Sequence, residues 1–226
     1  MKLASMRPVA KQSAESQVTD SLREFILSGT VKPGDRLTEV ALADHMGVAR
    51  ATLRTGLHRL ASEGIVTQIP YTGWQVVELT ADDVWELWTL RASLESLAAK
   101  LAAETPIEAR EQIEDAYQAL VAACRRGNLR KISECDFALH RAIVQASGHA
   151  RLKQQYRLVE QQVRLYISSS NDIVEEGPDA IVEQHRPIVE AILSGKGDIA
   201  AREAWGHNEQ EGQKLVKWLR AKTPVQ

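Results

Sequence analysis

The stretch from Leu42 to Leu60 constrains the fold more than any other part of the sequence. It holds two short helical patterns separated by Gly47, a residue that suits a tight turn. Apolar residues at helical spacing follow one side of the second pattern: Leu53, Leu57 and Leu60. Basic residues recur every four positions on the other side: Arg50, Arg54 and His58. No Asp or Glu occurs between positions 46 and 62, so this face suits an acidic partner, and one helix fits the DNA major groove.

The residues around this stretch predict a small domain with a hairpin. A helix is expected over 16–28, and Pro33-Gly34 is a turn signal. The two helical patterns themselves are expected to form helices over 39–46 and 50–63. β-rich runs at 65–70 and 74–79 are separated by Tyr71-Thr72-Gly73, which predicts a hairpin. Three helices and a hairpin indicate a winged helix-turn-helix over residues 1–79.

From residue 80 onward the sequence is helical in pattern. Caps and breaks predict six helices, at 80–104, 105–127, 128–147, 150–168, 178–194 and 198–221. A polar loop is expected over 168–177. The predicted fold class is therefore mainly α, with the winged helix-turn-helix followed by an antiparallel all-helical bundle of about six helices over 80–226.

Composition limits the remaining classes of protein. The formal net charge is −2, so any binding to nucleic acid must depend on a local basic patch. No run approaches the ~18–20 apolar residues of a membrane helix, and no hydrophobic signal segment is seen at the start. We therefore expect a cytoplasmic protein without a membrane partner. The two cysteines, Cys124 and Cys135, are expected to be buried reduced thiols.

Several motifs together resemble a known family. The strings that carry the resemblance are Lys32–Glu39, Leu42-Ala43, Val48–Arg54 and Arg59–Val66, with Gly73 in the hairpin. They resemble the GntR family of bacterial transcription regulators, and the helical remainder resembles the FCD ligand-binding domain of its FadR-like subgroup. The resemblance spans about residues 17–217. It implies a homodimeric transcription regulator, commonly a repressor, that binds a palindromic operator in double-stranded DNA and is not an enzyme.

Carried over residue by residue, the resemblance places the DNA contacts on Arg36, Arg50, Thr52, Arg54 and Gly73. Arginines near the start of a helix can pair with guanine O6 and N7, and each such pair discriminates by ~1–3 kcal/mol. A glycine in the wing lets the backbone approach the minor groove. The alternative is that the arginines only form a solvated helix face.

The sequence departs from the family pattern at four places. Ala49 and Ala51 stand where the family often has hydroxyl side chains, and a missing N-cap costs ~1 kcal/mol. Gly56 replaces a common alanine in the second helix, at roughly 1 kcal/mol. Tyr71-Thr72 occupies wing positions where a basic residue is frequent. These differences make the affinity and the operator sequence harder to predict than DNA binding itself.

A metal site is a second candidate. Asp136 and His140 are four residues apart and share a helix face, while His185 and His207 lie on the last two predicted helices. These side chains can converge in a bundle core, although isolated histidines are often surface or core residues. The resemblance implies that all four bind one divalent metal ion such as Zn, Ni or Mn, with positions left for an effector.

Arg91 resembles the arginine that faces the family's effector cavity, where it would pair with the carboxylate of a small organic acid. The alternative is a surface ion pair between Arg91 and Glu95. Two alternative functions remain for the chain, a metal-dependent enzyme that uses the Asp/His set and a metal-free sensor of acyl-CoA type. The tryptophans of the helical part are expected in the core or at an interface: Trp85, Trp88, Trp205 and Trp218.

Overall fold

The chain forms two compact units in a computed structural model that describes residues 13–171 and 177–222. The units are Met1–Val77 and Glu78–Gln226. The division falls two residues before the boundary expected from the sequence. Each unit has a separate hydrophobic core, so each is described by itself.

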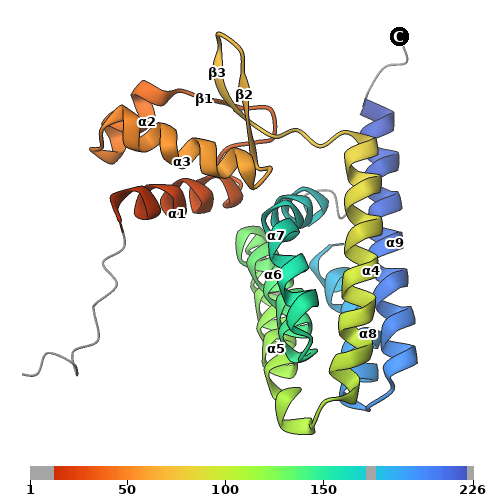
Figure 1. The fold of residues 1–226 in the computed structure, drawn as a ribbon. Helices are drawn as coiled ribbons and strands as arrows, with labels where there is room; N and C mark the ends of the chain where they lie inside the picture. The colour runs from red at the N-terminus through yellow and green to blue at the C-terminus, as the bar shows by residue number, and fades with distance from the viewer. Residues whose placement is uncertain (1–12, 172–176, 223–226) are drawn as a thin grey trace, which may run out of the picture. The chain divides into compact units, whose positions relative to one another are not determined.

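The first unit is a winged helix-turn-helix, as predicted (Figure 1). Its elements are α1 Ala14–Leu27, β1 Arg36–Leu37, α2 Glu39–Met46, α3 Arg50–Ser62, β2 Val66–Ile69 and β3 Gly73–Val76. The antiparallel sheet has the order β1-β3-β2, and β2–β3 is the expected hairpin. The strand β1 was not expected, because two residues are too few to show an alternating pattern. It pairs Leu37 with Trp74 and so joins the turn before α2 to the wing.

The turn between α2 and α3 is built as the sequence indicates. Gly47 ends α2 with a φ of 63°, in the left-handed region that favours glycine. The leucines of α3 are fully buried, whereas the basic residues on its other side are exposed. Gly56 lies against α1, where a Cβ atom would come within 3.3 Å of Thr19 Oγ1. Close packing against α1 therefore accounts for the glycine in this helix.

The second unit is the predicted helical bundle, and the fold class is confirmed as mainly α. Its helices are α4 Ala81–Glu104, α5 Glu111–Arg126, α6 Leu129–Ala146, α7 Ala150–Asn171, α8 Pro178–Leu193 and α9 Gly197–Lys222. The expected start of the second helix at position 105 is replaced by a short 3-10 turn, Ile107–Ala109. Of the loop expected over 168–177, residues 168–171 form the end of α7, and residues 172–176 lie outside the described residues. Among the described helices, none is long and apolar enough to cross a membrane.

The cysteines behave as predicted. Cys124 and Cys135 are both free and buried. Burial raises the pKa of the Cys124 thiol to about 11, so this group stays neutral near pH 7.

The helices α4 and α9 lie side by side along their length (Figure 1). Their approach depends on Gly212, where a Cβ atom would lie 2.3 Å from Trp88 Cγ. In contrast, a Cβ atom at Gly206, one of the other glycines of α9, would have nothing within 4 Å. The two glycines therefore occupy opposite environments on one helix.

Replacing Gly212 with alanine should lower the free energy of unfolding by about 1–3 kcal/mol or more, because the methyl group overlaps the Trp88 ring. The matched change Gly206→Ala should raise it by roughly 0.5–1 kcal/mol, through the higher helix propensity of alanine. Urea denaturation of the two variants measures both values. Equal effects of the two substitutions would contradict the close contact of α4 and α9.

Candidate metal centre and DNA-binding face

The residues expected to contact DNA lie on α3 and on the sheet beside it. Arg50 begins α3 and is exposed, Arg54 follows one turn later with its side chain 54% exposed, and Thr52 is partly buried between them. Arg36 is exposed on β1, and Gly73 begins β3 with a φ of 110°. The fold thus leaves the arginine side chains of this set available to a partner.

An acidic residue that the sequence argument did not single out holds this face together. The Glu39 carboxylate accepts a hydrogen bond from Trp74 Nε1 at 2.8 Å and lies 3.5 Å from Arg54 Nε. The His58 ring meets the Trp74 ring edge-on, with centroids 4.8 Å apart. Glu39 therefore connects the strand β3 of the wing to α3. Because the Glu39 carboxylate lies next to Nε of Arg54, the two terminal nitrogens of the Arg54 guanidinium can point outward.

The four expected metal ligands come together inside the second unit. Asp136 and His140 project from α6, His185 from α8 and His207 from α9, and all four are at least nine-tenths buried. Asp136 Oδ1 lies 3.2 Å from Nε2 of both His140 and His185. One ligand atom from each histidine lies within 4.8 Å of the others.

The hydrogen bonds behind two of the rings fix which nitrogen carries a lone pair. His185 Nδ1 lies 2.7 Å from the Ile181 carbonyl oxygen, which can only accept, so Nδ1 is the donor. His140 Nδ1 lies 3.0 Å from the Glu95 carboxylate and donates in the same way. In the neutral rings both Nε2 atoms are then acceptors, yet they lie 3.1 Å apart beside the Asp136 oxygen. Three acceptors this close repel one another unless a cation lies among them.

The charge states agree with a cation site. Burial works against the Asp136 carboxylate, but His185 and His140 hold its pKa well below the usual range. For His140, burial is outweighed by the Glu95 carboxylate, which raises the pKa of the ring. Burial and the neighbouring imidazoles lower the pKa of His207 far below its usual value, so this ring is neutral. His207 Nδ1 is buried with no hydrogen-bond partner in the described structure. A metal ion, or a proton on His140, can satisfy this set of acceptors.

Glu95 of α4 lies at the centre of the polar groups behind the histidines. It is 3% exposed, and each of its oxygens accepts two hydrogen bonds. Oε1 accepts from Arg91 Nε at 2.9 Å and from the Tyr156 hydroxyl at 2.8 Å. Oε2 accepts from Asn208 Nδ2 and faces His140 Nδ1, both at 3.0 Å. One carboxylate therefore joins side chains from α4, α6, α7 and α9.

Arg91 is paired with Glu95, but the pair is buried rather than on the surface. The guanidinium carbon lies 5.4 Å from the centre of the Tyr166 ring. Its Nη2 atom is buried and has no hydrogen-bond partner among the described residues, and the same is true of Asn208 Oδ1. A buried donor and a buried acceptor without partners lower the stability of the folded protein unless a bound molecule or water forms hydrogen bonds with them.

Sequence reasoning did not assign Glu39, Tyr156 or Asn208 to a site, and it considered Glu95 only as a surface partner of Arg91. A signal was present for Glu95, because Arg91 and Glu95 recur at helical spacing with Trp88 and Ala98 on the apolar side of α4. The other three lie far from their partners in the sequence, so no local pattern singles them out.

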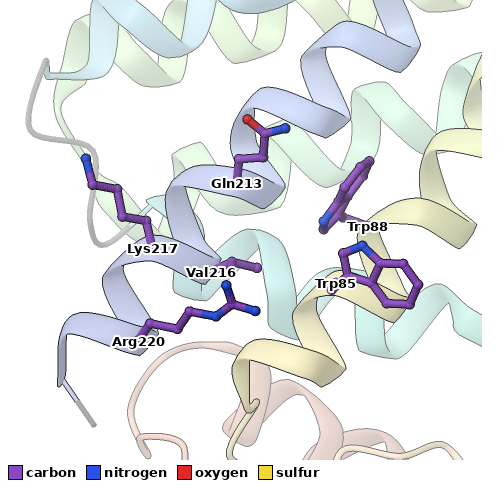
Figure 2. A pocket seen from close by; sticks show the side chains of 6 residues that line it. All are labelled: Trp85, Trp88, Gln213, Val216, Lys217 and Arg220. Carbon is purple, nitrogen blue, oxygen red and sulfur yellow. The ribbon is translucent and has the colours of Figure 1, made fainter. Parts of the chain in front are cut away.

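A separate hollow of about 440 Å³ lies between the start of α4 and the end of α9. Figure 2 shows the two indoles that line it from α4 and four side chains from α9. The lining residues are Trp85, Trp88, Gln213, Val216, Lys217 and Arg220. None of them belongs to the histidine cluster. Trp88 is buried, whereas Trp85, Trp205 and Trp218 are 37–56% exposed and so do not belong to the core.

Two family models match the chain, one for each unit. Residues 14–76 match the bacterial regulatory proteins of the gntR family, and residues 86–210 match the FCD domain. Among similar sequences, a probable D-xylose utilization operon transcriptional repressor of Paenarthrobacter nicotinovorans is 26% identical over 198 residues, which cover 87% of this chain and 86% of that protein. The Nta operon transcriptional regulator of Aminobacter aminovorans is 26% identical over 84% of this chain and 88% of its own length.

Solved structures share the fold. A GntR transcriptional regulator from Rhodococcus sp. RHA1 superposes with a TM-score of 0.80 at 20% identity, over 90% of this chain and 97% of that one. Escherichia coli McbR/YncC gives a TM-score of 0.74 at 20% identity, over 94% and 99% of the two chains.

Replacing Glu95 with glutamine should lower the free energy of unfolding by about 3–5 kcal/mol, because Arg91 is then buried without its opposite charge. The matched change Tyr156→Phe removes one hydrogen bond to the same carboxylate and should cost about 1 kcal/mol. Chemical denaturation followed by circular dichroism compares the two. A cost for Glu95→Gln no larger than that for Tyr156→Phe would mean that the charge of Glu95 is not what holds the group together.

Proposed function

Because the chain belongs to the GntR family of bacterial transcriptional regulators and carries an FCD domain, we propose that it is a repressor controlled by a small organic acid. In this proposal a homodimer binds a palindromic operator through α3 and the wing, with Arg36, Arg50, Thr52, Arg54 and Gly73 as the contacts. The acid binds beside a divalent metal ion in the second unit. The main observation behind the proposal is that Asp136 and three histidines come together inside the second unit. The other unit of the same chain exposes the arginines of α3.

The residues proposed to hold the metal are Asp136, His140, His185 and His207. Their donor set of one carboxylate and three imidazoles suits Zn, Ni or Mn. Such an ion would supply a Lewis-acidic centre with positions left for oxygen ligands. The hydrogen bonds from His140 and His185 to Glu95 and to the Ile181 carbonyl support the proposal, since they hold both rings with Nε2 toward the centre.

Arg91 is the residue proposed to recognise the acid. Its Nη2 atom is a buried cationic donor without a partner among the described residues, and a carboxylate is the ligand group that best completes such a donor. The bond from Arg91 Nε to Glu95 fixes the guanidinium plane, which keeps Nη2 in one position. The acid would therefore meet a preformed donor near the metal ligands.

The alternatives are weaker. The family and the relatives are transcription regulators and not enzymes, so a metal-dependent enzyme is not supported. A metal-free sensor of acyl-CoA type needs a proton on His140 to keep three buried acceptors this close together, and it leaves the buried His207 Nδ1 without a partner among the described residues.

Replacing Arg54 with alanine should weaken binding to a selected operator by about 10- to 100-fold, since one arginine–base pair is worth about 1–3 kcal/mol. Arg59→Ala is the matched control, because Arg59 is exposed on the last turn of the same helix and should leave affinity within about twofold. Fluorescence anisotropy with a duplex chosen by the wild-type protein from a random library measures both. Equal affinity of Arg54→Ala and the wild type would refute the assignment of α3.

Purified protein reconstituted with Zn, Ni or Mn should hold about one ion per chain, and His140→Ala should lose it. An organic acid that binds the metal-loaded protein should raise its melting temperature, because a ligand bound to the native state stabilises it by mass action. Arg91→Lys should keep the ion and lose the response to the acid.

Two results would contradict this part of the proposal. One is metal content well below one ion per chain after reconstitution, with no change in His140→Ala. The other is a response to the acid that persists unchanged in Arg91→Lys. The control is His45→Ala, which removes an exposed histidine of α2 and should affect neither measurement.

A further inference from the structure

The tip of the wing holds its one aromatic residue in an unfavourable backbone conformation. Tyr71 has a φ of 62°, and among the described residues it is the one non-glycine residue with a positive φ. The Thr72 amide donates to the Ile69 carbonyl at 3.1 Å, so residues 69–72 form a β-turn with Pro70 at its second position and Tyr71 at its third. A turn with proline second and a positive φ third favours glycine or asparagine at the third position. A tyrosine there is strained.

No contact of the Tyr71 side chain within the described structure offsets this strain. The side chain is 110% exposed relative to a reference tyrosine, so it packs against nothing in the described structure. A large apolar ring held in solvent on a strained turn destabilises the free protein. Strain that is kept without an internal contact points to a contact made with a partner.

The wing also has no charge with which to hold DNA. From position 64 to position 77 the sequence contains no Asp, Glu, Lys or Arg. The wing therefore neither attracts nor repels phosphate groups, and any contact that it makes must be through uncharged groups. Tyr71 is the large side chain that the tip can offer.

The wing is attached to the arginine face of α3. Trp74 lies three residues after Tyr71 on β3, and its Nε1 shares the Glu39 carboxylate with Arg54. The hairpin β2–β3 projects beyond α3 (Figure 1). When Arg54 lies at a major groove, the tip that carries Tyr71 is held beside the same segment of duplex.

We propose that Tyr71 is the side chain through which the wing contacts DNA, in addition to the backbone at Gly73, with its uncharged ring lying in the minor groove next to the sequence that α3 reads. This inference rests on the proposed function. The minor groove is about 6 Å wide and admits the edge of an aromatic ring, and apolar side chains are used there by other DNA-binding proteins. The contact would add affinity without releasing counterions, unlike the contacts of the arginines.

Three substitutions separate this role from a structural one. Tyr71→Gly and Tyr71→Asn both suit a positive φ, so both should raise the melting temperature of the full-length protein by roughly 2–4 °C. Both should weaken binding to the selected duplex by about tenfold, because the ring is gone. Tyr71→Phe keeps the ring and should bind within about twofold of the wild type. Stability should therefore rise while affinity falls. Replacing a residue with a purely structural role would instead lower both.

The dependence of affinity on salt provides the second measurement. Anisotropy titrations from 50 to 200 mM salt should give the same slope for Tyr71→Gly as for the wild type, whereas Arg54→Ala should reduce the slope by about 1. Unchanged affinity of Tyr71→Gly would overturn the inference, as would a loss in Tyr71→Phe equal to that in Tyr71→Gly. A fall of affinity and melting temperature together would also overturn it. Failure of the wild type to select any sequence would instead refute the proposed function.

Discussion

The second unit depends on the carboxylate of Glu95. It is buried and charged, and four donors from four helices surround it. Burial alone would raise its pKa, but Arg91 and then His140 hold the pKa well below the usual range, so the group stays ionised. A buried charge is tolerated only when its partners are complete. The positions of the Arg91 guanidinium, the Asn208 amide and the His140 ring are therefore set together by one acceptor.

Much of the fold could be predicted because its signals are local. Gly47 and the leucines of α3 lie within one short stretch, and their spacing alone defines a helix, a turn and a second helix. Caps such as Asn128, whose side chain accepts from Lys131 N, mark helix starts in the bundle. β1 could not be predicted, because a two-residue strand exists only through its pairing with β3.

The candidate site was predictable to a smaller extent. Spacing put Asp136 and His140 on one face of α6, but the approach of His185 and His207 was inferred from a family resemblance. The role of Glu95 in orienting the site could not be predicted, because its carboxylate meets Tyr156 and Asn208 across 61 and 113 residues of sequence. Arg91 shows the difficulty most clearly. The spacing to Glu95 indicated an ion pair correctly, but spacing alone does not distinguish a surface pair from a buried one.

The proposed regulation has one covalent route, since the first unit ends at Val77 and α4 begins at Ala81. Arg91 and Glu95 lie on that same helix, so a ligand that completes Arg91 Nη2 acts on the element that leads into the DNA-binding unit. Such a ligand changes operator binding only if it prefers one of two arrangements of the protein. The four hydrogen bonds to the Glu95 carboxylate resist a gradual bend of α4 at this point, because such a bend would strain all of them at once. We therefore expect α4 to move as one body with its capping box at Thr80 and Asp83, rather than to bend between the site and its first turn.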